Sequence, residues 1–293
     1  MATLAQWVEG ARPRTLPTAL SPVIAGTGAA IGNGVIAPGR ALLALVVAVS
    51  LMIGVNYAND YSDGIRGTDD ERVGPLRLVG SSLVAPTTVR AAAFVAFAVA
   101  ALAGLTLVSV SRQWWLIAVG AVCIAAAWFY TGGSRPYGYM GLGEIAVFVF
   151  YGLVGVLGTV LTQSGPPGAM SVLTAIGVGM LTSAVLVANN LRDIPTDTAV
   201  GKRTLAVLMG DRDTRRLYAA MVLLPFLISV GAGLRSWPML LALLAVPFAV
   251  LPVRDVLGGA EGIKLVRVLA QTGVLLLAWS LLTAIGLAVG RFV

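Results

Sequence analysis

Long uninterrupted runs of apolar residues alternate with short polar segments along this chain of 293 residues. Within the runs, apolar and polar positions do not alternate, so the pattern favours helices over strands. A helix needs roughly 20 mainly apolar residues to cross the hydrocarbon core of a bilayer. The pattern therefore predicts an all-α, polytopic membrane protein with nine transmembrane helices, at about Leu16–Ile36, Ala41–Tyr57, Val89–Val110, Trp114–Tyr130, Leu142–Thr162, Ser171–Val187, Leu217–Leu234, Trp237–Val253 and Val266–Val289.

The composition agrees with a membrane protein, because 58% of the residues are hydrophobic and only 11% are charged. Soluble proteins have about 25% charged residues. Charged residues precede the first run and no small-residue cleavage site stands out, so we expect a retained span and not a signal peptide. The chain has no His, and its single Cys123 lies in the fourth run. Imidazole chemistry, a disulfide framework and a thiolate metal site are therefore excluded.

The charged residues gather on one side of the predicted membrane. Sixteen of the twenty Lys and Arg residues, and all thirteen Asp and Glu residues, fall on the side of the N-terminus. Cytoplasmic loops carry the excess of Lys and Arg, so we expect the N-terminus and this polar face to be cytoplasmic, in an inner or plasma membrane. The net charge of +7 then reflects topology, and no nucleic-acid partner is expected. An alternative explanation for the absence of acids from the outer side is that the outer loops are too short to carry many charges. That explanation does not account for the clustering of the acids within the inner segments.

Two acidic segments on this face have the same internal spacing. Asn59 and Asp63 lie four residues apart in the first, and Asn189, Asp193 and Asp197 repeat that spacing in the second. Residues four apart lie on one face of a helix, so each segment can direct several oxygens to one point.

Four predicted spans separate the two segments, so both segments emerge at the same membrane surface, as in a parallel repeat. Clusters of carboxylate and amide oxygens suit Mg²⁺, which completes its coordination with water and substrate phosphate. Nearby Arg and Lys side chains would bind the remaining oxygens of a diphosphate. The alternative is a pair of solvated loops with ordinary salt bridges.

These segments resemble the paired aspartate motifs of the UbiA superfamily of intramembrane prenyltransferases, and within it the 1,4-dihydroxy-2-naphthoate branch. The resemblance covers nearly the whole chain, and its motifs are at residues 12–17, 59–75 and 189–204. It implies nine helices around a central cavity that opens sideways to lipid, with the two acidic segments as Asp-rich loops on the cytoplasmic side. We expect a single domain over residues 1–293, with two four-helix pseudo-repeats at about 16–130 and 142–253 and a ninth helix.

The resemblance also implies roles for individual residues. It assigns metal binding, by two Mg²⁺ ions, to Asn59, Asp63, Asp193 and Asp197, with Asp60 as an auxiliary ligand. The expected catalytic residues are Asp60, Asp63, Asp193 and Asp197. The family's first motif has its last Asp at a position that is Gly67 here, so Asp69 or Asp70 would replace it. Residues expected to bind substrate are Asn56, Tyr130, Thr131, Arg135, Asn189, Lys202 and Arg203, together with Arg14. Arg14 would bind the acceptor carboxylate, or it is an arginine that extends to the membrane surface.

The expected reaction is Mg²⁺-dependent transfer of a polyprenyl chain from its diphosphate to 1,4-dihydroxy-2-naphthoate. Decarboxylation and release of diphosphate would give demethylmenaquinol, a step of menaquinone synthesis. No residue is an obvious general base, and Asp60 or the ring hydroxyls remain alternatives. Glu144 lies just inside the fifth run. A functional role explains its position there, and the preference of acids for helix N-termini explains it equally well.

Other functions are less consistent with the pattern. Another aromatic acceptor, such as 4-hydroxybenzoate or homogentisate, is the nearest alternative. Secondary transporters usually place their acids near the middle of the membrane, whereas here the acids lie at span ends. CDP-alcohol phosphotransferases use Asp clusters within one segment, whereas here the two clusters are far apart in the chain.

The topology can be tested by cysteine labelling. With Cys123 replaced, a cysteine at Ser111 should react with a membrane-impermeant reagent added outside the cell, and a cysteine at Thr68 only from inside. The positive-inside distribution is the reason for this expectation. Reversed labelling would place the acidic segments on the outer face.

Overall fold

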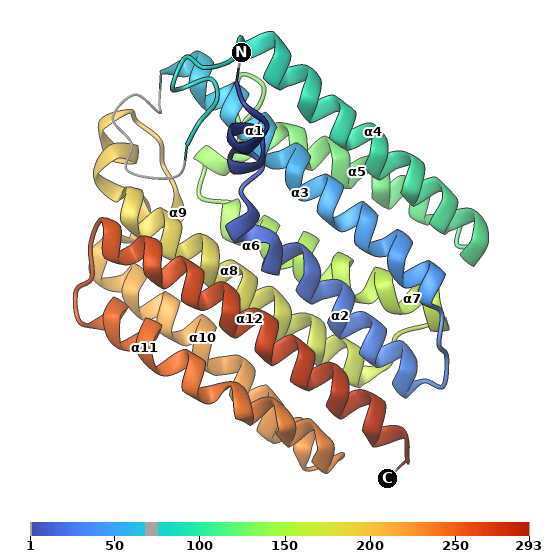
Figure 1. The fold of residues 1–293 in the computed structure, drawn as a ribbon. Coiled ribbons are helices and arrows are strands. Elements are labelled where there is room, and N and C mark those ends of the chain that lie inside the picture. Colours follow the sequence, from blue (N-terminus) through green and yellow to red (C-terminus); the bar gives the residue numbers. More distant parts are fainter. Residues whose placement is uncertain (1, 68–75, 293) are drawn as a thin grey trace.

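The computed structural model describes residues 2–67 and 76–292, and in these residues the chain is helical with no β-strand. Asp69, Asp70 and the Gly74–Pro75 pair of the first motif lie outside the described residues. Figure 1 shows the long helices as a bundle in which the axes run in broadly the same direction. The predicted all-α, polytopic class is confirmed.

Each predicted span coincides with a long helical segment, although the number nine is approximate. Seven of these segments are long and apolar enough to cross a membrane, while α5 is shorter, with 14 residues, and α2 has 17. The long segments are α2 (Leu16–Gly32), α3 (Pro38–Arg66), α4 (Pro86–Ser111), α5 (Leu116–Phe129), the continuous α6 (Gly143–Val147), η3 (Phe148–Leu157) and α7 (Gly158–Ser164), α8 (Ala169–Ala199), α10 (Asp211–Gly233), η4 (Trp237–Ala245) with α11 (Val246–Leu257), and α12 (Ile263–Val289). Short elements are α1 (Leu4–Gly10), η1 (Pro13–Thr15), η2 (Tyr137–Tyr139), α9 (Leu205–Met209) and η5 (Gly290–Phe292).

Two helices extend well beyond their predicted ends. Helix α3 was expected to stop at Tyr57 and α8 at Val187, but they continue to Arg66 and Ala199. The description of the acidic segments as loops is therefore wrong for residues 56–66 and 189–199, which are helical. Hydropathy marks where side chains become polar, whereas the backbone hydrogen bonds of a helix continue past that point. Helical geometry at both ends is what brings residues four apart onto one face.

The two largest of three hydrophobic clusters in the described residues divide the bundle. The larger core joins α8, α10, α11 and α12, with Leu181, Tyr218 and Trp279 fully buried. A smaller core joins α3, α4 and α5 to the segment that carries Leu78 and Val79. Helix α2 packs against both α3 and α12 and so connects the two parts. The division into two pseudo-repeats stays a prediction.

The outside of the bundle is apolar. Large side chains are exposed on several helices, for example Leu102 (66%), Leu227 (66%) and Leu244 (63%). In water such surfaces would be unfavourable over so large an area, and a bilayer provides hydrocarbon for them to contact. The chain is therefore a multi-pass membrane protein.

Small residues allow the closest approach between α2 and α12. A Cβ added at Gly28 would lie 2.3 Å from the Cα of Ala284. Interfaces between membrane helices commonly use small residues in this way, because they let the backbones approach.

Replacing Gly28 with Ala should therefore destabilise the bundle by about 1–3 kcal/mol, since overpacking of a tight interface forces the backbone to shift. Thermal unfolding of the purified protein in detergent measures the effect. Gly120→Ala is the matched control, because a Cβ there meets nothing within 4 Å. Equal behaviour of the two variants would contradict the close packing of α2 on α12.

Candidate functional site

The two acidic helix ends lie at the same end of the bundle. Figure 1 shows the end of α3 near α9, which follows α8, whereas the C-terminus lies at the opposite end. The carboxylates there are buried: Asp63, Asp193 and Asp197 are 3%, 5% and 7% exposed. Since isolated buried charges are strongly unfavourable, the partners of these groups define the site.

Asp63 is held by a cation and a phenol. Arg77 Nη2 lies 3.3 Å from its Oδ2, and the hydroxyl of Tyr139 donates to its Oδ1 at 2.5 Å. Arg77 belongs to the segment that follows the described end of α3, and Tyr139 belongs to η2. Asp63 thus connects three parts of the chain.

Asp193 is held within α8 itself. Arg192 donates from Nε and Nη2 to its two oxygens at 2.7 and 2.8 Å, which is the two-point geometry that favours Arg over Lys. Asn189 Nδ2 lies 3.3 Å from Asp193 Oδ2, and Arg192 also donates to Asn189 Oδ1. The predicted pairing of Asn189 with Asp193 across one turn is therefore present.

Asp197 is held from the segment that follows α8. Lys202 Nζ lies 3.6 Å from its Oδ1, and the hydroxyl of Thr204 lies 3.5 Å from its Oδ2. The backbone N–H of Lys202 donates to the carbonyl of Asp197, which closes the turn at the end of the helix.

Tyr139 connects the two acidic segments. Its hydroxyl bonds to Asp63 of the first segment, while Lys202 of the second lies over its ring at 4.8 Å. Arg66, at the end of α3, lies 5.5 Å from the same ring. Cations over an aromatic face are attracted by its quadrupole. An uninterrupted set of contacts therefore runs from Asp63 through Tyr139 and Lys202 to Asp197.

Residues 130–139 are fastened to α3 at further points. The hydroxyl of Thr131 donates to Asn59 Oδ1 at 2.8 Å, and Arg66 donates to the carbonyls of Thr131 and Gly133. Thr131 thus orients the side chain of a residue expected to bind metal. Burial raises the pKa of Tyr137 to about 12, and its hydroxyl donates to the carbonyl of Ala126.

In the described residues, Asp60 and Asn56 bond to neighbouring loops and not to the acidic cluster. Both oxygens of Asp60 accept from backbone N–H groups, at 2.6 Å from Leu78 and 3.1 Å from Val79. Asn56 Nδ2 donates to the carbonyl of Ala11, 3.0 Å away, and lies 3.4 Å from the hydroxyl of Thr15. These two residues hold the loops around the site.

The remaining expected residues are arranged differently. Tyr130 ends α5 and packs edge-on against Tyr137. The guanidinium groups of Arg14, Arg135 and Arg203 are exposed and make no hydrogen bond within residues 2–67 and 76–292. The structure leaves both interpretations of Arg14 open.

Sequence reasoning did not assign roles to Tyr139, Arg77 and Arg192. Arg192 was detectable in principle, because it stands directly beside Asp193 in the motif. Tyr139 and Arg77 reach Asp63 across 76 and 14 residues of chain, and no local spacing indicates such contacts.

The oxygen donors fit a hard cation such as Mg²⁺. Within the described residues, no three His, Cys, Asp or Glu side chains are grouped closely enough to hold a metal by themselves. Mg²⁺ needs fewer protein ligands, because it is usually bound by one or two carboxylates together with water and phosphate oxygens. Asp63 with Asn59, and Asp193 with Asp197, provide such sets on two facing helix ends.

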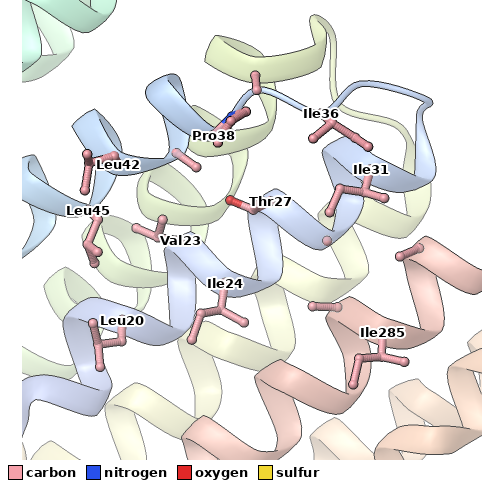
Figure 2. A pocket seen from close by; sticks show the side chains of 15 residues that line it. Leu20, Val23, Ile24, Thr27, Ile31, Ile36, Pro38, Leu42, Leu45 and Ile285 are labelled. Atoms are coloured by element: carbon pink, nitrogen blue, oxygen red, sulfur yellow. The ribbon is translucent and has the colours of Figure 1, made fainter.

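An apolar hollow of about 690 Å³ lies along α2, between the start of α3 and the end of α12. Figure 2 shows Leu20, Val23, Ile24 and Ile31 of α2 facing it, with Thr27 as a polar side chain in the lining. Such a lining suits hydrocarbon.

Comparisons with known proteins identify the family and the fold. The model of the UbiA prenyltransferase family matches residues 19–258. The 1,4-dihydroxy-2-naphthoate octaprenyltransferase of Mycobacterium tuberculosis is 54% identical over 99% of both chains, and that of Escherichia coli is 36% identical over 98% of this chain and 96% of its own. A solved UbiA homologue from Archaeoglobus fulgidus, bound to GPP and Mg²⁺, has a TM-score of 0.70 at 11% identity and covers 95% of this chain and 99% of its own.

The connection through Tyr139 can be tested by removing one oxygen. Tyr139→Phe keeps the ring that Arg66 and Lys202 contact but removes the donor to Asp63. A hydrogen bond to a charged group contributes about 1.5–3 kcal/mol, so unfolding in detergent should show a loss of that size. Tyr61→Phe is the control, since the ring of Tyr61 stacks on Trp128 and its hydroxyl makes no hydrogen bond within the described residues. Similar small losses in both variants would contradict a connecting role for Tyr139.

Proposed function

The chain belongs to the UbiA prenyltransferase family, and we propose that it transfers a polyprenyl chain from polyprenyl diphosphate to 1,4-dihydroxy-2-naphthoate. The observation that carries the proposal is the contact between the two acidic helix ends through Tyr139. This contact brings oxygen donors and cations from both ends to one buried point, which is the chemistry that a diphosphate requires.

Binding of the diphosphate is assigned to both segments. Two pairs of residues would hold Mg²⁺, most simply as two ions: Asn59 with Asp63, and Asp193 with Asp197. When bound, Mg²⁺ stabilises negative charge on the leaving oxygens. Lys202 and Arg192 lie beside these carboxylates and supply donors for phosphate oxygens. Arg135 and Arg203 are exposed at the same end and can reach the outer oxygens of the diphosphate.

The chain's own residues then prepare the reaction. Departure of the diphosphate leaves an allylic cation, which an electron-rich ring carbon attacks. Water would capture the same cation, so an apolar surrounding favours transfer over hydrolysis. Thr131, Tyr139 and Asp60 hold the loops around the site in place through their hydrogen bonds.

The choice of acceptor rests on the similar enzymes. Relatives that match along nearly their full lengths carry the name 1,4-dihydroxy-2-naphthoate octaprenyltransferase. We assign the same acceptor to this chain, with attack at the carboxyl-bearing carbon, loss of CO₂ and release of diphosphate. The product is demethylmenaquinol, an intermediate of menaquinone synthesis.

The proposed place of the reaction is the cytoplasmic face of the inner or plasma membrane. The excess of Lys and Arg at the end of the bundle that holds the acids supports this orientation. The polyprenyl chain extends from the polar end towards hydrocarbon, and the hollow along α2 in Figure 2 offers a surface of that kind.

The acceptor is tested with purified protein, Mg²⁺ and radiolabelled polyprenyl diphosphate. We expect prenylation of 1,4-dihydroxy-2-naphthoate with release of CO₂, and essentially no product from 4-hydroxybenzoate. Asp193→Asn is the control for background transfer: it keeps side-chain volume, and it should lose at least about 10²–10³ in rate, as for other preorganised electrostatic groups. Comparable turnover of both acceptors would assign the chain to a different branch.

A further inference from the structure

Glu144 is a buried carboxylic acid that the contacts of the acidic cluster do not include. It stands in the first turn of α6 and is 3% exposed. Asn190 of α8 donates to its Oε1 at 2.8 Å, and the hydroxyl of Ser183 donates to its backbone carbonyl at 3.1 Å. Its second oxygen, Oε2, is buried without a hydrogen-bond partner among the described residues.

An unpartnered carboxyl oxygen at this depth is unfavourable. Leaving a buried polar group unsatisfied costs about 1–3 kcal/mol, and more for a charged group. Acidic residues inside membrane bundles are rare, and they usually line a pathway or a binding site. Among the described residues, the side-chain contacts of Glu144 use only one of its two oxygens, which leaves the other without a donor from the protein.

The position of Glu144 relates it to the acidic cluster. Asn190, which holds it, lies next to Asn189 and one helical turn before Asp193 in α8. One turn rises about 5 Å, so Glu144 lies one layer deeper in the bundle than the carboxylates assigned to the diphosphate. A ring that reaches the first carbon of a bound polyprenyl diphosphate from the membrane side would lie in this layer.

The segment after Glu144 is packed rigidly against α8. A Cβ added at Gly152 of η3 would lie 2.5 Å from the Cα of Gly179. The element η3 is a π-helix, and π-helical turns are frequent at functional sites. The helical segment that begins at Glu144 is therefore closely packed on α8, and Asn190 holds the Glu144 side chain itself.

We infer that Oε2 of Glu144 accepts a hydrogen bond from a ring hydroxyl of the aromatic acceptor, and so orients the ring towards the polyprenyl diphosphate. The inference rests on the proposed function, because it assumes a hydroxynaphthoate acceptor. In 1,4-dihydroxy-2-naphthoate the 1-hydroxyl lies beside the carboxylate and bonds to it internally. The 4-hydroxyl is the donor that remains free, and we assign it to Glu144.

Two variants separate this role from a merely structural one. Glu144→Gln keeps the volume and an acceptor for Asn190, and it places an amide donor where the free oxygen was. In Glu144→Gln, rotation of the Asn190 amide could let the new Gln side chain turn its oxygen back towards the ligand. Glu144→Met removes both side-chain oxygens, so no such rotation can restore an acceptor at residue 144. Both variants should raise KM for the acceptor by about 10- to 100-fold, the loss expected for one hydrogen bond to a charged group. KM for polyprenyl diphosphate should stay within about twofold, as for unrelated sites.

Acceptor analogues give a second measurement that does not depend on turnover. 1-Hydroxy-2-naphthoate lacks the 4-hydroxyl, and 4-hydroxy-2-naphthoate keeps it. The ligand-induced rise in melting temperature of the wild-type protein should be much smaller for the first analogue than for the second. In Glu144→Met the two analogues should give similar rises. If the variants do not fold, the wild-type series still decides: equal rises for the two analogues would overturn the assignment.

Gln163→Met is the matched control variant. Gln163 is 2% exposed and also has a buried oxygen without a partner among the described residues, but it lies at the opposite end of the bundle, where Arg40 of α3 contacts α7. This variant should lose stability and keep KM for the acceptor. A wild-type KM in both Glu144 variants, or an equal rise in the Gln163 variant, would overturn the inference. Failure of the proposed function looks different: no naphthoate would stabilise the wild-type protein or be prenylated by it.

Discussion

The pairing of each buried carboxylate with a cationic or hydroxyl donor, from another segment for Asp63 and Asp197 and from within α8 for Asp193, holds the polar end of this bundle together. Asp63 is bound by Arg77 and Tyr139, Asp193 by Arg192, and Asp197 by Lys202. In an apolar bundle, loss of one partner leaves a charge that no solvent can satisfy, which is far more unfavourable than at a water-exposed surface. The loops of the site are therefore fixed by the charges they carry. The same constraint makes Glu144 informative, because one of its oxygens has no hydrogen-bond partner in the part of the chain that the structure describes.

The sequence predicted the helical segments and the spacing within the acidic segments, because both depend on local periodicity. The pairing of Asn189 with Asp193 across one turn is an example. The ends of α3 and α8 were predicted too early, since hydropathy reports the membrane boundary and not the end of backbone hydrogen bonding. Contacts across long stretches of chain, such as Tyr139 with Asp63 or Asn190 with Glu144, were not predictable, because they depend on how separate helices pack.

The structure also distinguishes acidic residues that look alike in the sequence. Asp60 and Asp63 lie three residues apart, yet Asp60 accepts from two backbone N–H groups while Asp63 is held by side chains. A carboxylate that accepts two backbone bonds closes a loop and has less capacity left for a ligand. The two acids therefore have different roles. Asp60 holds residues 78–79 in place, and Asp63 faces the segment of Tyr139. The number of acids in a motif does not show which acid bonds to the backbone and which bonds to side chains.

The π-helical stretch of η3 has a consequence for comparing this chain with its relatives. Each π turn closes one residue later than an α turn, so the side chains of α7 point in directions that an uninterrupted α-helix would not give them. An alignment without a gap between this segment and a relative that is α-helical throughout would match residues on different faces. Thr159, which lies against Gly26, and Gln163, which bonds to Thr27, are the positions most exposed to that error. Residue equivalences beyond Leu157 have to be taken from superposed backbones.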